Sequence, residues 1–140
     1  AGPGESRMII DTLFRANETW AIVEKETGTV IGSIGLEPDK YRPEIKSREM
    51  GYSLAKSRWG RGYMTEAAAR LIRYAFETLK LEILMIRTSD TNIRSQRVIE
   101  KSGFLYEGTL RYAYRMYDSK IREVRCYSML RAEFLAKQES

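Results

Sequence analysis

Histidine is absent from the 140-residue sequence, and cysteine occurs once, as Cys126. These absences exclude a histidine-based catalytic triad, a cysteine–histidine dyad, zinc-finger spacing and any disulfide within the chain. No apolar run approaches the roughly 20 residues that span a bilayer, and the sequence does not open with a secretory signal pattern. We therefore expect a cytoplasmic protein with no metal centre and no membrane association.

Positive charge exceeds negative charge, with a formal net charge of +5 and an isoelectric point near 9.4. This excess favours an anionic partner, which on charge alone is a nucleic acid, a phosphorylated cofactor or an acidic surface. The length suits a single domain, residues 1–140, that needs no metal or disulfide for stability. Residues 1–4 read as a flexible leader or an expression scar.

Apolar periodicity predicts a mixed α+β sheet with flanking helices. The spacing of Met8, Ile9, Leu13 and Phe14 predicts a short amphipathic helix from Glu5. The rest of the pattern predicts strands at 20–25, 30–36 and 49–54, a helix at 64–79, a strand at 83–86, a helix that Gly103 ends, and two long strands between 104 and 130 joined at 118–120. The order is α-β-β-β-α-β-α-β-β, with antiparallel hairpins and one parallel pair across the long helix.

The segment 57–66 joins the third predicted strand to the long helix. Gly60 and Gly62 let backbone amides turn toward one point without obstruction by a Cβ atom. The helix that follows adds unpaired N–H groups and the positive end of its dipole, and Arg58 and Arg61 add charge. This combination predicts a phosphate-binding turn. The alternative is an ordinary tight turn with solvated arginines.

A second motif follows the predicted strand at 83–86. Asn92 and Ser95, three residues apart at a helix start, face one side of that helix. Taken with the segments 51–54, 59–67, 92–104, 107–111 and 127–130, the sequence resembles the GNAT superfamily of acyl-CoA N-acyltransferases from about Trp20 onward. It is most similar there to the Rim-type ribosomal-protein N-terminal acetyltransferases, which act on alanine or serine.

The resemblance implies a GNAT-like fold, a mixed and mostly antiparallel sheet, without the family's usual first strand and helix. We therefore expect residues 1–140 to be a single GNAT domain that is incomplete at its N-terminus. It also implies acetyl-CoA as co-substrate. The pyrophosphate would rest on the backbone amides of the turn, and the pantetheine arm would lie against residues 50–54 where two strands splay. The implied cofactor-binding residues are Tyr52, Ser53, Leu54, Trp59, Gly60, Arg61, Gly62, Tyr63, Met64, Thr65, Asn92 and Ser95.

Proton transfer needs other groups, because many relatives carry a tyrosine acid where this sequence has Ile99. Without histidine, a carboxylate, a tyrosine or water must take the proton of the attacking amine. We take Glu49 as the candidate catalytic base, with Glu123 as its rival, and Ser95 as the candidate proton donor to sulfur. Structural alternatives are a helix cap at Asn92, a backbone-bonded Ser95 and a surface ion pair at Glu49.

The predicted function is transfer of an acetyl group from acetyl-CoA to a primary amine, such as a protein N-terminus. The alternatives are acetylation of a polyamine, an antibiotic or another small amine, and a non-catalytic module that binds CoA, RNA or the ribosome. We expect a monomer or homodimer with no direct nucleic-acid contact. Tyr112, Tyr114 and Tyr117 alternate along a predicted strand, which fits either packing or substrate contact.

Overall fold

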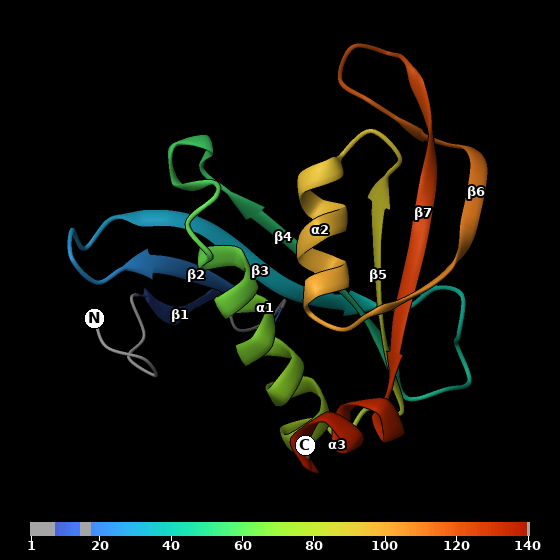
Figure 1. Cartoon of the computed structure of the whole chain (residues 1–140), viewed down its shortest axis with the longest axis horizontal. Helices are drawn as coiled ribbons and strands as arrows, with labels where there is room; N and C mark the ends of the chain where they lie inside the picture. Colours follow the sequence, from blue (N-terminus) through green and yellow to red (C-terminus); the bar gives the residue numbers. More distant parts are fainter. Residues whose placement is uncertain (1–7, 15–17, 140) are drawn as a thin grey trace.

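The computed structural model describes residues 8–14 and 18–139 (Figure 1). Their strands form one seven-stranded sheet in the order β1-β2-β3-β4-β5-β7-β6. Within it β4 and β5 are parallel and the other neighbours are antiparallel, which confirms the predicted mixed sheet. The strands are β1 (Met8–Phe14), β2 (Thr19–Glu24), β3 (Val30–Pro38), β4 (Ser47–Leu54), β5 (Ile83–Ser89), β6 (Leu105–Arg115) and β7 (Ile121–Leu130).

The first element is a strand, so the helix predicted from Glu5 to Phe14 is wrong over its described part. Met8 pairs with Glu24 and Phe14 pairs with Thr19, which places β1 along the edge of the β2–β3 hairpin. The run carries three β-branched residues, which favour extended structure, and pairing with β2 satisfies backbone groups along the strand. Residues 1–7, with the predicted leader and the start of that helix, lie outside the described residues.

In the part of the chain that the structure describes, three α-helices accompany the sheet. α1 (Tyr63–Arg73) continues into a π-helical turn (Tyr74–Thr78), so the long predicted helix is confirmed with a change of winding near its end. α2 (Ile93–Lys101) ends at Ser102, and Gly103 follows it with φ of +98°, as the sequence predicts. The sequence reading missed α3 (Arg131–Glu139), although the segment is rich in good helix formers. The observed order is therefore β-β-β-β-α-β-α-β-β-α.

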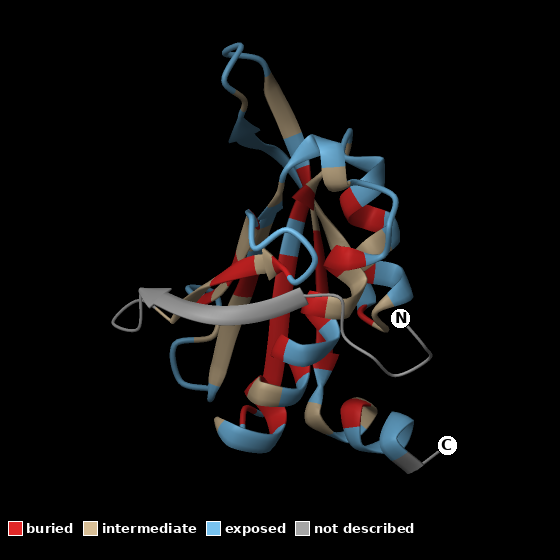
Figure 2. Cartoon of the chain, turned by 90° about the vertical axis from the view of Figure 1, so that its left-hand side faces the viewer, coloured by how far each residue is buried: buried red, intermediate tan, exposed pale blue. Residues whose placement is uncertain are grey.

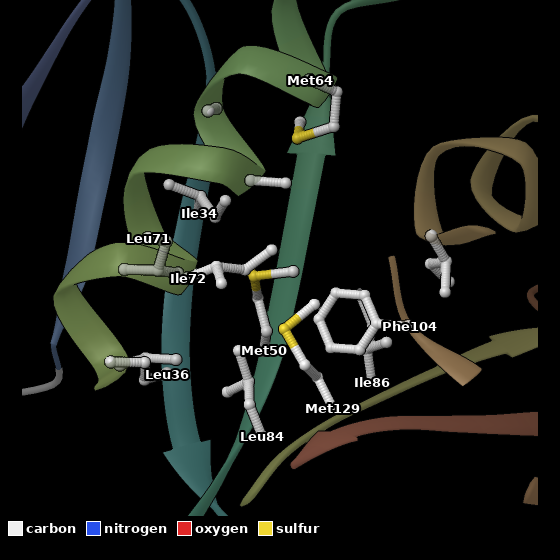
Figure 3. Close-up of a cluster of buried hydrophobic side chains, with 14 of the residues drawn as sticks. Ile34, Leu36, Met50, Met64, Leu71, Ile72, Leu84, Ile86, Phe104 and Met129 are labelled. Carbon is white, nitrogen blue, oxygen red and sulfur yellow. The ribbon is translucent and has the colours of Figure 1, made fainter. Parts of the chain in front are cut away.

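Alternate residues along the strands define two faces. The helix face carries Met50 and Ile86 against α1 and α2, in one large apolar cluster that includes Phe104 and Met129 (Figures 1 and 3). The opposite face, here called the loop face, carries a smaller buried cluster of Met85, Val124 and Cys126. Buried residues run along the middle of the sheet (Figure 2). The core thus lies almost entirely on one side of the sheet.

The β6–β7 hairpin extends past the rest of the sheet (Figure 1). Its turn lies at residues 118–120 as predicted, closed by hydrogen bonds between the backbones of Met116, Ser119 and Lys120. The pairing is irregular between Leu110 and Tyr114. Tyr112, Tyr114 and Tyr117 are all exposed, so the packing interpretation is wrong for these three tyrosines.

Candidate active site

The candidate site lies where β4 and β5 separate. The parallel ladder runs from Ser47 opposite Ile83 to Met50 opposite Ile86, which is its last pair. Beyond it, β4 continues through 51–54 paired with β3, and β5 continues through 87–89 paired with β7. The two strands diverge visibly behind α2 (Figure 1). The backbone edge of residues 51–54 that faces β5 is therefore left for another extended chain to pair with.

The predicted phosphate-binding turn follows β4. A 3₁₀ helix at Lys56–Arg58 leads into Gly60 and Gly62, whose φ angles of +76° and +80° favour glycine strongly over other residues. Gly62 is the N-cap of α1, and the first bond to it is donated by the backbone N–H of Glu66. The N–H groups of Met64 and Thr65 therefore have no acceptor within the helix, as at any helix start. The structure thus contains the two backbone features, glycines with positive φ and a helix start, on which the prediction of an anion-binding turn rests.

A buried carboxylate lies beneath this turn. Glu24, 3% exposed at the end of β2, accepts hydrogen bonds from Arg58 Nε (3.1 Å) and Tyr63 Oη (2.5 Å) on Oε2. Its Oε1 accepts from Arg58 Nη2 (3.1 Å) and Thr27 Oγ1 (2.8 Å). The bonds from Arg58, Tyr63 and Thr27 lower the pKa of Glu24 to about 2. The sequence reading missed Glu24, and it assigned Arg58 only a charge toward a phosphate.

A strand-period argument would have found Glu24. Trp20, Ile22 and Glu24 alternate along β2, and Trp20 and Ile22 both join the core of the helix face. A carboxylate at the third such position must be buried with partners. Its partners lie 34 and 39 residues further along the chain, so the sequence alone does not name them.

Trp59 connects the turn to α2. Its indole Nε1 donates to the carbonyl of Leu54 at 3.0 Å, and the guanidinium of Arg94 lies 4.6 Å from the ring centroid. Such cation–π contacts at exposed sites contribute about 0.5–1 kcal/mol. Trp59 thus joins the end of β4 to the first turn of α2, across the point where the strands have separated.

Asn92, Ser95 and Tyr52 come together at the start of α2. Asn92 Oδ1 accepts from the backbone N–H of Ser95 at 3.1 Å, so Asn92 caps the helix. Ser95 Oγ lies 2.8 Å from Tyr52 Oη of β4. Burial raises the pKa of Tyr52, which keeps its hydroxyl protonated at neutral pH. The structure therefore adds a direct Tyr52–Ser95 contact to the two predicted motifs.

Glu49 projects from the loop face immediately before the last β4–β5 pair. Its carboxylate accepts from Arg87 Nε (2.5 Å) and Nη2 (3.1 Å), and Arg87 also lies over the ring of Tyr41. The structure therefore shows the ion pair that was the alternative interpretation of Glu49, and Arg87 holds the Glu49 carboxylate beside the diverging strands. Glu123, the rival base, is exposed on β7.

The remaining predicted cofactor residues take distinct positions. Leu54 contacts the core of the helix face, Ser53 is exposed, and Met64 is buried beneath α1. Arg61 is exposed, and Thr65 is partly buried in the first turn of α1. Met64 is therefore part of the core, and the other four lie between the end of β4 and the first turn of α1 in the sequence.

A second buried carboxylate, also missed by the sequence reading, organises the loop face. Asp39, 5% exposed, accepts from Arg42 Nη1 (2.9 Å), Ser47 Oγ (2.6 Å) and the backbone N–H of Tyr41 (2.9 Å). Arg42 Nη2 also donates to both carboxylate oxygens of Glu107 on β6, at 2.6 and 2.9 Å. The hydrogen bonds from Ser47 and Arg42 lower the pKa of Asp39 against the opposing effect of burial. The loop between β3 and β4 is thereby fastened across the sheet.

Comparison with known proteins decides the family. The acetyltransferase (GNAT) domain matches residues 3–105, which extends the likeness upstream of Trp20. The chain belongs to the GNAT acetyltransferase family. It is 31% identical over 115 residues to the uncharacterized N-acetyltransferase p20 of Bacillus licheniformis, covering 82% of this chain and 63% of that protein.

Two further proteins are similar to this chain, one in sequence and one in fold. The ribosomal-protein-serine acetyltransferase of Escherichia coli is 30% identical over 90 residues, covering 64% of this GNAT chain and 49% of that enzyme. The ribosomal-protein-S5-alanine acetyltransferase of Vibrio fischeri superposes with a TM-score of 0.75 at 22% identity, covering 84% of this chain and 64% of that structure. The chain therefore spans between about half and two thirds of the length of these relatives.

Residues 8–14 and 18–139 contain the α-helices α1, α2 and α3. None of the helices there is long and apolar enough to cross a membrane. In the same residues, no group of three or more cysteine, aspartate or glutamate side chains is placed to hold a metal ion.

Proposed function

We propose that this GNAT domain transfers an acetyl group from acetyl-CoA to a primary amine. One structural arrangement carries the proposal. The edge of β4 at residues 51–54, which no longer pairs with β5, leads into a turn with positive φ at Gly60 and Gly62, and α1 begins directly after that turn. Acetyl-CoA fits this surface in chemical terms. Its amide-bearing arm matches a free strand edge, and its pyrophosphate matches converging N–H groups at a helix N-terminus.

The residues divide into cofactor and chemical roles. The backbone of residues 59–65 would hold the pyrophosphate, and residues 52–54 with Asn92 would hold the arm. Within the described residues the Asn92 side-chain nitrogen makes no hydrogen bond, so it is available to a ligand. Acetyl-CoA supplies an acyl thioester that an amine can attack. A backbone N–H of the separated β4 segment would stabilise the charge that develops on the thioester oxygen.

Proton transfer is assigned to side chains on both faces. Glu49, oriented by Arg87 beside the diverging strands, accepts the amine proton directly or through water. Ser95 supplies a proton to the departing sulfur and takes one in turn from the hydroxyl of Tyr52, 2.8 Å away, which solvent then reprotonates. Neither step needs histidine.

We infer further that the acceptor is a protein N-terminus. The support is the 30% identity with the ribosomal-protein-serine acetyltransferase, joined to the motifs shared with Rim-type enzymes. Polyamines and antibiotic amines are the competing acceptors. They are included in the assay below as separate arms.

The deciding experiment is a thiol-release assay with acetyl-CoA. Peptides that begin with serine or alanine, spermidine and an aminoglycoside are compared, with Gly62→Val as the inactive control. Thiol release with a peptide, together with loss of that release in Gly62→Val, supports both acetyl transfer and a protein N-terminus as the acceptor. Release with spermidine or the aminoglycoside alone overturns the acceptor class. CoA binding without release from any acceptor in the panel overturns the catalytic proposal.

A further inference from the structure

We propose that Glu24 is a positioning residue for the phosphate-binding turn, holding the two ends of that turn through Arg58 and Tyr63. The inference rests on the proposed function, because it assigns the turn a cofactor to receive. Glu24 itself lies in β2 and contacts the turn only through these side chains. Nothing in the GNAT motifs of the sequence points to it.

The geometry places one carboxylate between both flanks of the turn. Arg58 is the last residue of the 3₁₀ helix before the turn, and Tyr63 is the first residue of α1 after it. Both donate to the same oxygen, Oε2 of Glu24, at 3.1 and 2.5 Å. The second oxygen takes Arg58 Nη2 and the hydroxyl of Thr27 in the β2–β3 turn. The distance between the two flanks is therefore set by the sheet.

The turn needs such a restraint. Gly60 and Gly62 have a larger range of backbone conformations than any other residue type, and ordering them costs conformational entropy. A Cβ atom at Gly60 would meet no atom within 4 Å, so packing does not fix that position. Gly62 has no side chain with which to cap α1. A fixed carboxylate below the turn lowers the entropy that phosphate binding must overcome.

The negative charge of Glu24 maintains its hydrogen bonds to Arg58 and Tyr63. The pKa of Glu24, about 2, keeps the carboxylate ionised throughout the range in which acetyl transfer is assayed. Arg58 donates to it through Nε and Nη2, while Arg58 Nη1 donates to Ser57 Oγ at 3.0 Å. Two arrangements then predict opposite results. If Glu24 positions the turn, neutralising it weakens cofactor binding. If Arg58 is itself the phosphate ligand and Glu24 competes for it, neutralising Glu24 tightens binding.

The first test is a CoA titration by calorimetry on the whole chain. Glu24→Gln and Arg58→Gln are each expected to weaken CoA binding by about tenfold, and the double variant by little more than either single change, because both act through one pair. Asp39→Asn is the matched control, since it also neutralises a buried, arginine-bound carboxylate, and it should leave CoA affinity unchanged. In steady-state assays Glu24→Gln should raise the KM for acetyl-CoA while most of kcat is retained.

The second test does not use the cofactor. Amide hydrogen exchange of residues 60–65 in the free protein should be faster in Glu24→Gln than in the wild type, and unchanged in Asp39→Asn. Tyr63→Phe, which removes a single hydroxyl, should show the same acceleration and serves if Glu24→Gln does not fold. Unchanged exchange in the turn, or CoA binding that is unchanged or tighter in Glu24→Gln, overturns the inference. A wild type that does not bind CoA overturns the proposed function, and exchange alone then decides the role of Glu24.

Discussion

Glu24 and Asp39 are built alike and serve different parts of the molecule. Each is a buried carboxylate held by one arginine and at least one hydroxyl, and in each case these hydrogen bonds lower its pKa. Glu24 lies on the helix face and joins the two ends of a glycine turn. Asp39 lies on the loop face and fastens a connection between two strands. The comparison teaches that the function of a buried carboxylate follows from what its partners are attached to.

The largest expected effect is on turnover, in a variant of Glu49 on the loop face. Glu49→Gln should lower kcat by about 10²–10⁴-fold with little change in CoA affinity, because it removes the base and leaves the turn intact. The measurement is turnover across a pH series, with Glu123→Gln as control. Wild-type turnover in Glu49→Gln with an unchanged acidic limb would remove Glu49 from the mechanism.

A smaller effect is expected on CoA affinity, in a variant of the glycine turn that precedes α1. Gly62→Val should weaken CoA binding at least tenfold, about 1.4 kcal/mol, because valine strongly disfavours φ of +80° and obstructs the turn. Binding is measured by calorimetry on protein whose circular dichroism matches the wild type. A folded Gly62→Val variant with unaltered CoA affinity would contradict the assignment of the turn.

Asp39→Asn sharpens the comparison of the two carboxylates. The change weakens charge-assisted hydrogen bonds from Arg42 and Ser47, so the free energy of unfolding should fall by about 1–3 kcal/mol. Urea denaturation measures the loss, and turnover of the folded enzyme under saturating acetyl-CoA should be retained. A variant as stable as the wild type would show that the loop is held by its other contacts.

Ser95→Ala concerns the contact that crosses from β4 to α2. We expect a fall in kcat of about tenfold, smaller than for Glu49→Gln, because a solvent proton can partly replace the hydroxyl at sulfur. Tyr52→Phe should produce a similar loss, and the double variant should be no worse than either, since the two hydroxyls form one pair. Additive losses would assign the two residues independent roles.

The smallest expected effect is on how the free energy of unfolding depends on pH in acid, through Glu24. The folded pKa of Glu24, about 2, lies below its ordinary value of 4.5. Its contribution to stability is therefore complete above about pH 4.5 and is lost as the pH falls toward 2. Glu24→Gln should flatten the dependence of stability on pH in that window, as measured by urea denaturation at successive pH values. An unchanged slope would indicate that the ion pair persists in the unfolded chain.

Local signals in the sequence predicted most of the elements and the outline of the site. The Gly60–Gly62 turn followed by an amphipathic stripe, the hairpin residues at 26–29 and the Gly103 stop each act within a few positions, and each is confirmed. The helix prediction for Met8–Phe14 was wrong because the apolar spacing of this segment fits both a helix and a strand. Pairing with β2 decided between them. The same ambiguity does not affect α1, whose pattern covers several turns.

What the sequence determined by itself is the position of the glycine turn, the helix after it and the cap at Asn92, since each depends on backbone preferences of nearby residues. Tertiary structure alone decided the partners of the charged side chains. Glu24 meets Arg58, Glu49 meets Arg87 and Arg42 meets Glu107 across separations of 34, 38 and 65 residues. Such pairs depend on strand order and register, which place distant segments side by side. The physical reason is that burial forces a carboxylate such as Glu24 to find a partner, while the fold determines which charged side chains are within reach of one another.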